Sequence, residues 1–138
     1  MDTLNQLRSL HHGDCVVCGD SHEHGLKLQF RVTNPHEVSA SFDCDEAFQG
    51  YANMLHGGVI SGLLDGAMTN CLFAQGHVAV TGELRVKFRH PVATASRATI
   101  RAWIVENRPP YYLLNAELTQ EGQLKAKAEG KFIERPAA

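Results

Sequence analysis

Apolar and polar residues alternate along much of this chain, the pattern of strands that bury one face. The first two runs, 26–33 and 38–43, are separated by the turn residues "NPHE" and predict a hairpin. Four more alternating runs follow later, at 81–92, 97–106, 111–120 and 123–134. The last two are joined by Glu121 and Gly122, which predict a tight turn. Short connections between sequential strands favour an antiparallel sheet.

Two stretches carry helical spacing instead. Residues 57–75, "GGVISGLLDGAMTNCLFAQ", are apolar almost all round, which is typical of a helix enclosed by protein. Leucines at three-residue spacing predict a short amphipathic helix at 4–10. The apolar face of the sheet needs a cover, and 57–75 is the one long helix available. The chain therefore predicts an α+β fold, in which a curved antiparallel sheet wraps a long central helix.

The exceptions to the apolar pattern of 57–75 form a stripe. Ser61, Asp65 and Thr69 recur every four residues, so they share one helix face. Three glycines run alongside the stripe, at positions 58, 62 and 66. Each interior glycine weakens a helix by roughly 0.5–1 kcal/mol relative to alanine. We therefore expect another helix or a ligand to approach the backbone closely there.

Asp65 is the charged member of this stripe. A buried carboxylate is unfavourable unless it is paired, hydrogen-bonded or neutralised, and such groups have shifted pKa values that suit a general base. The alternative is structural: Asp65 caps a neighbouring strand or bonds across a dimer contact. The stripe alone supports both interpretations.

The tripeptide His56, Gly57, Gly58 marks the start of the helix. Free N–H groups and the positive end of the helix dipole at this point can stabilise an oxyanion, although an ordinary glycine-rich turn has the same composition. Asp65 lies eight residues beyond Gly57, about 12 Å along a helix axis. One helix cannot present both groups to one carbonyl, so the spacing favours a two-fold dimer with shared sites.

"LHGGVISGLLDGAM" followed by "VTGELRVKFRHPV" closely resembles the hotdog-fold acyl-CoA thioesterases of the 4-hydroxybenzoyl-CoA thioesterase superfamily, phenylacetate-pathway branch. The resemblance implies a hotdog fold, dimers often doubled to tetramers, and hydrolysis of an acyl-CoA without a cofactor. It assigns Asp65 as general base or nucleophile. It also assigns the N–H of Gly57 or Gly58, beside His56, as the carbonyl polariser, and Thr81 as the residue that positions water.

Candidate substrate-binding residues surround these positions. Some relatives carry Asn or Gln six residues before the histidine, where this chain has Gly50 with Gln49 and Asn53 nearby. Arg85 and Arg89 share the outward face of one predicted strand and offer charges to coenzyme A phosphates, although a solvated, aggregation-resistant face is the simpler explanation for such residues. The full set is Gln49, Asn53, Ser61, Thr69, Arg85 and Arg89.

The segment "CVVCGDSHEH" has the composition of a zinc site: Cys15, Cys18, His22 and His24. No second cysteine pair with finger spacing follows, so the main expectation is no metal and an ordered loop packed beside the site. The cysteines are expected to be reduced, since the N-terminus lacks a signal-peptide pattern and indicates a cytoplasmic protein.

Length and charge narrow the function classes. The 138 residues predict a single domain, 1–138, with 1–25 as an N-terminal extension. A net charge of -2 offers no basic surface for nucleic acid, and no apolar run is long enough to span a membrane. Two other functions stay open: a noncatalytic acyl-CoA-binding hotdog module, and a hotdog hydratase or dehydratase.

Overall fold

The computed structural model describes residues 2–135, which form one antiparallel sheet and two α-helices. The elements are α1 (Thr3–His12), β1 (Arg31–Asn34), β2 (Glu37–Asp43), the 3-10 turn η1 (Glu46–Phe48), α2 (Gly57–Ala74), β3 (Ala79–Phe88), β4 (Arg97–Arg108), β5 (Tyr111–Gln120) and β6 (Gln123–Glu134). The strand order is β1-β2-β4-β5-β6-β3, with every neighbouring pair antiparallel. The predicted α+β class is confirmed.

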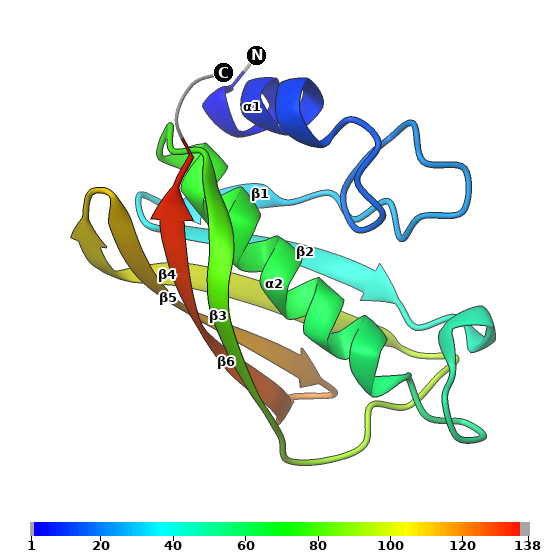
Figure 1. Cartoon of the computed structure of the whole chain (residues 1–138). Helices are drawn as coiled ribbons and strands as arrows, with labels where there is room; N and C mark the ends of the chain where they lie inside the picture. The colour runs from blue at the N-terminus through cyan, green and yellow to red at the C-terminus, as the bar shows by residue number, and fades with distance from the viewer. Residues whose placement is uncertain (1, 136–138) are drawn as a thin grey trace.

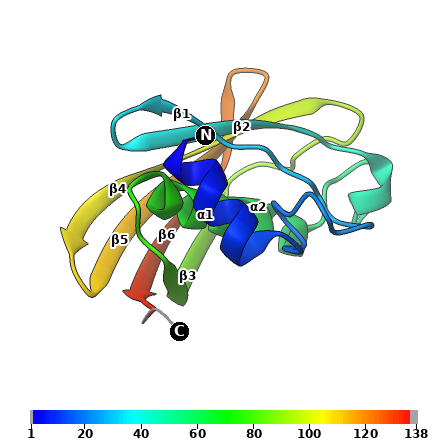
Figure 2. The ribbon, with the colours of Figure 1, turned by 90° about the horizontal axis from the view of Figure 1, so that it is seen from above.

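The sheet curls round α2, and α1 lies over α2 where the strands do not cover it (Figures 1 and 2). Leu63, Leu64 and Met68 of α2 are fully buried in the single core that results. This explains why α2 is apolar on nearly every side. None of the helices in residues 2–135 combines the length and hydropathy of a membrane span.

β3 forms one edge of the sheet. It pairs with β6 on one side, and no other strand of residues 2–135 lies along its second edge. Three apolar side chains of this strand are exposed: Val80 by 43%, Leu84 by 36% and Phe88 by 55%. A ten-residue edge with exposed apolar groups is a surface that proteins normally cover or pair.

The N-terminal part departs from the alternating pattern. The predicted strand at 26–33 begins only at Arg31, because the backbone before it bonds to the preceding loop. Leu26 N donates to Val16 O at 2.7 Å, and Leu28 N donates to Val17 O at 2.8 Å. Leu28 still faces the core, as its pattern predicted. The predicted face was therefore right at Leu28 and Phe30 but wrong at Val32, which is exposed, and the predicted start of the strand was wrong.

Candidate active site

The start of α2 presents a free backbone donor at Gly57. His56 is the N-cap residue, and its Nδ1 accepts the N–H of Gly58 at 2.8 Å. The Gly57 N–H finds no acceptor among the described residues, and Gly57 is exposed at the positive end of the helix dipole. Of the two amides expected to polarise a carbonyl, the cap therefore occupies Gly58 and leaves Gly57 open.

Asp65 and Thr81 meet where α2 packs against β3. The Thr81 hydroxyl donates to Asp65 Oδ1 at 2.6 Å. Asp65 is half-buried, and no described residue donates to its second carboxylate oxygen. A register shift between Thr81 and Glu83 follows immediately and turns β3 at this point. The pair thus joins the central helix to the exposed edge strand and leaves one carboxylate oxygen open.

Burial raises the pKa of the Asp65 carboxyl above its ordinary value. The Thr81 hydrogen bond and the nearby His12 favour the charged form and act in the opposite direction. The pKa of His12 is itself lowered, first by burial and then by the neighbouring His11, while Asp65 opposes this change. A carboxylate made more basic by burial is suited to accept a proton near neutral pH.

The helix start and Asp65 remain separate within one chain. Eight residues of helix divide Gly57 from Asp65, about 12 Å of axial rise. An open cavity of about 610 Å³ adjoins the helix start and is lined in part by Tyr51, His56, Gly57, Phe88 and Arg89. Neither Asp65 nor Thr81 lines this cavity. Each chain therefore carries two half-sites at different points of α2.

The candidate substrate-binding residues do not gather in one place. Arg89 lines the cavity at the helix start, together with Gly50. Arg85 points to the outer face of the sheet, 4.0 Å from both Glu83 and Glu129, so it does not face the helix side.

The other candidates make local contacts. Gln49 Oε1 accepts the Asn53 N–H at 3.2 Å within the exposed loop before α2. Ser61 Oγ donates to Gly57 O at 3.0 Å, one turn back along the helix. Thr69 is buried, 6% exposed. The two hydrogen bonds shape the loop and the helix, and only the one from Ser61 reaches the helix start, at Gly57.

A family model described as the thioesterase superfamily matches residues 52–124, more than half of the chain. The chain belongs to the thioesterase superfamily. It is 30% identical over 116 residues to acyl-coenzyme A thioesterase THEM4 of Bos taurus, in an alignment that covers 80% of this chain and 48% of THEM4. The chain thus spans about half the length of this curated relative.

Several solved structures share the fold. Thioesterase superfamily member 2 from Mus musculus matches with a TM-score of 0.76 and 17% identity, over 95% of this chain and 93% of that one. The protein smu.793 from Streptococcus mutans, solved bound to acetyl CoA, matches with a TM-score of 0.74 and 17% identity, over 78% and 88% of the two chains. The hotdog fold expected from the sequence is confirmed.

In this thioesterase-superfamily chain the glycines of α2 face a loop of the same chain. A Cβ built on Gly66 would lie 2.6 Å from Val17 Cγ1, and one built on Gly62 would lie 3.7 Å from Val17 Cγ2. Gly58 instead faces the ring of its own cap, His56. Of the three glycines at which a close approach was predicted, Gly66 alone is closely approached by another segment of the chain. That segment is the N-terminal loop, which neither of the expected candidates, a second helix or a ligand, had included.

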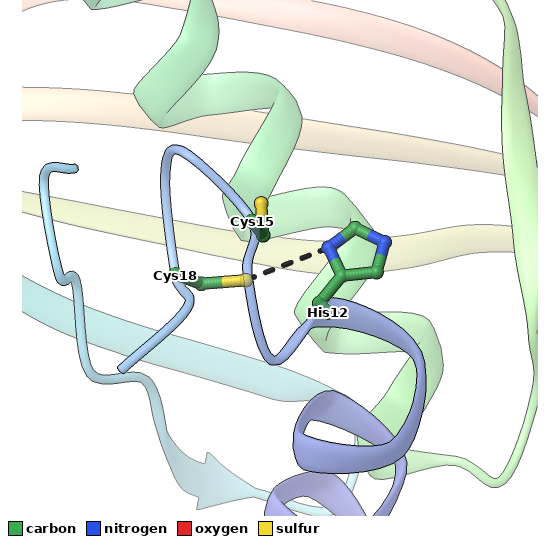
Figure 3. A group of neighbouring side chains, drawn as sticks. All are labelled: His12, Cys15 and Cys18. Atoms are coloured by element: carbon green, nitrogen blue, oxygen red, sulfur yellow. Dashed lines mark hydrogen bonds between the residues drawn. The ribbon is translucent and has the colours of Figure 1, made fainter. Parts of the chain in front are cut away.

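The cysteine pair lies in that same loop, next to His12 (Figure 3). The ligand atoms of His12, Cys15 and Cys18 all lie within 4.8 Å of one another. His22 and His24 do not belong to this group, and His22 Nδ1 accepts the His24 N–H at 3.2 Å. The four-residue zinc set considered from the sequence is therefore not assembled.

His12 takes the place of those two histidines, although the four-residue set considered from the sequence left it out. Its signal was its position in the last turn of α1, three residues before Cys15.

Proposed function

We propose that this chain is an acyl-CoA thioesterase that hydrolyses its substrate to the free acid and coenzyme A. The observation that carries the proposal is the half-buried Asp65, bonded to Thr81 and left with one open oxygen. Membership of the thioesterase superfamily supports it, as do the similarity to THEM4 and the acetyl CoA bound to the Streptococcus mutans relative.

The proposed roles follow from the two half-sites. The thioester carbonyl oxygen accepts the Gly57 N–H, whose position at the helix start stabilises the developing oxyanion. Asp65 accepts a proton from a water molecule as that water attacks the carbonyl carbon, and the Thr81 hydroxyl holds the carboxylate in place. The tetrahedral intermediate then collapses, the C–S bond breaks, and coenzyme A leaves as a thiolate that takes up the proton.

Both half-sites act on one carbonyl only if they come from two chains. We propose a two-fold dimer in which the helix start of one chain faces Asp65 of the other. Pairing along the free edges of β3 would cover Leu84 and Phe88, which are exposed in the single chain. Arg89, beside the cavity, is the candidate contact for a coenzyme A phosphate. A pairing of dimers into tetramers stays a prediction.

The test is thiol release from short, medium, long and aromatic acyl-CoAs. Asp65→Asn keeps the shape of the side chain and removes the base, so we expect a rate loss of at least about 100-fold. Glu129→Gln is the matched control, because it removes one charge from the outer face of the sheet and should leave the rate unchanged.

Two results would contradict the proposal. One is hydrolysis that survives Asp65→Asn. The other is acyl-CoA binding by a folded wild type that releases no thiol from any substrate, which would favour the noncatalytic binding module.

A further inference from the structure

The end of α1 and the loop that follows it bring three metal-ligating side chains together against α2 (Figure 3). We propose that His12, Cys15 and Cys18 bind one thiophilic divalent transition-metal ion, preferably Zn²⁺, with a water molecule as the fourth ligand. The site shares no residue with the proposed hydrolytic machinery, next to which it lies through His12 and Asp65, and the proposal does not depend on that machinery.

The distances fit tetrahedral coordination. A zinc ion with Zn–S of about 2.3 Å and Zn–N of about 2.05 Å holds the nitrogen and sulfur about 3.6 Å apart. His12 Nδ1 lies 3.6 Å from Cys18 Sγ. Two sulfurs on such an ion lie about 3.8 Å apart. Because all three ligand atoms are already within 4.8 Å of one another, Cys15 has to move by no more than about 1 Å.

The turn that carries the two sulfurs is held in shape before any ion binds. Arg8, 4% exposed, donates to Cys18 O at 3.0 Å and forms an ion pair with Asp20 at 3.2 Å. Gly19 N donates to Cys15 O at 2.9 Å, and a Cβ at Gly19 would lie only 2.4 Å from Cys15 N. Such fixed surroundings reduce the rearrangement that a bound ion requires.

The Cys15 sulfur is held in place and is reachable from the surface. The Val17 N–H donates to Cys15 Sγ over 3.4 Å, a contact that helps to fix the position of this sulfur. A surface hollow of about 510 Å³, lined by residues 9–15, reaches both His12 and Cys15 and provides a path for the ion and its water.

The second sulfur starts as a thiol. Burial raises the pKa of Cys18 to about 12, against the opposing effects of Asn70 and Arg8. The incoming ion therefore displaces the thiol proton to solvent and takes its place on the sulfur.

Cobalt(II) is the probe, because thiolate ligation gives it a charge-transfer absorption that zinc lacks. Reduced, metal-free protein is titrated with Co²⁺ without oxygen, and Zn²⁺ is then added to displace it. We expect one Co²⁺ per chain and loss of the band in Cys15→Ser and in Cys18→Ser. In each of these two variants the Kd for Co²⁺ should rise by more than about 100-fold, beyond the 10–100-fold that is typical when a residue next to a metal ligand is lost.

His24→Ala is the matched control and should bind as the wild type does, because His24 lies outside the cluster. Cys15 is only half-buried, so Cys15→Ser carries the test if Cys18→Ser fails to fold. Absence of the band in wild type, or a band that survives Cys15→Ser, would overturn the proposal. Thiol release by the metal-free protein reports separately on the hydrolytic proposal.

Discussion

Gly66 is the position where the packing of the N-terminal loop on α2 can be tested most directly. A methyl group there would meet Val17 Cγ1 at 2.6 Å, a separation that forces the loop or the helix to move. Gly62 is the matched position one turn away, where the same methyl group would rest at 3.7 Å, an ordinary contact distance. Gly66→Ala and Gly62→Ala therefore share the chemistry and differ in the space available.

The expected changes in unfolding free energy have opposite signs. Alanine in place of glycine stabilises a helix interior by about 1 kcal/mol at most. Overpacking a filled contact destabilises by about 1–3 kcal/mol. Gly62→Ala should gain about 0.5–1 kcal/mol from helix propensity alone. Gly66→Ala, in which the clash opposes that gain, should lose up to about 2 kcal/mol.

Urea unfolding at fixed protein concentration, followed by circular dichroism, measures both values, with an unchanged m-value as the check on two-state behaviour. The double variant Gly66→Ala with Val17→Ala isolates the contact. Because Val17→Ala removes the clashing methyl group, the double variant should be more stable than the sum of the single changes by about 1–3 kcal/mol.

Two results would refute this reasoning. If Gly62→Ala destabilises as much as Gly66→Ala, the space at these glycines is occupied by something other than Val17. If Val17→Ala fails to relieve Gly66→Ala, the loop does not pack on the helix as described.

Two further predictions concern the proposed site. The Thr81 hydroxyl favours charged Asp65 and lowers its pKa. Thr81→Ala should therefore raise that pKa and move the acid limb of the kcat/KM profile to higher pH, with a rate loss on the order of tenfold. An acid limb that stays in place would show that the Thr81 hydroxyl does not act on the catalytic base. Leu84→Lys places a charge on the exposed edge of β3, so sedimentation should show folded monomers that no longer release thiol; an active monomer would contradict the shared site.

The C-terminal hairpin shows what the sequence predicts well. The ranges 111–120 and 123–134, read from alternation, coincide with β5 and β6, because each of these strands has one face in the core. The turn between them, at Glu121 and Gly122, has φ of 53° and 75°, the positive values that a two-residue hairpin turn requires. Such features are local, so the pattern of neighbouring residues is sufficient to reveal them.

The N-terminal third shows where local pattern fails. Val16 and Val17 take the backbone bonds that would have extended β1, and Val17 also fills the space at Gly66, about fifty residues away in sequence. His12 joins the cysteines only because α1 ends against α2. Pairings between distant segments leave no periodic signal. The contact of Asp65 with Thr81 was anticipated only through the family resemblance.

The enclosure of α2 limits how this chain can change over evolutionary time. The sheet, the N-terminal loop and the proposed second subunit cover different sides of the helix, so nearly every turn of it is constrained by a neighbour. The loop before the helix, with Tyr51 83% exposed, and the exposed residues 89–91 after β3 carry far fewer such constraints. We expect that adaptation to a different acyl group would proceed by substitutions in those two loops, while the helix keeps its sequence.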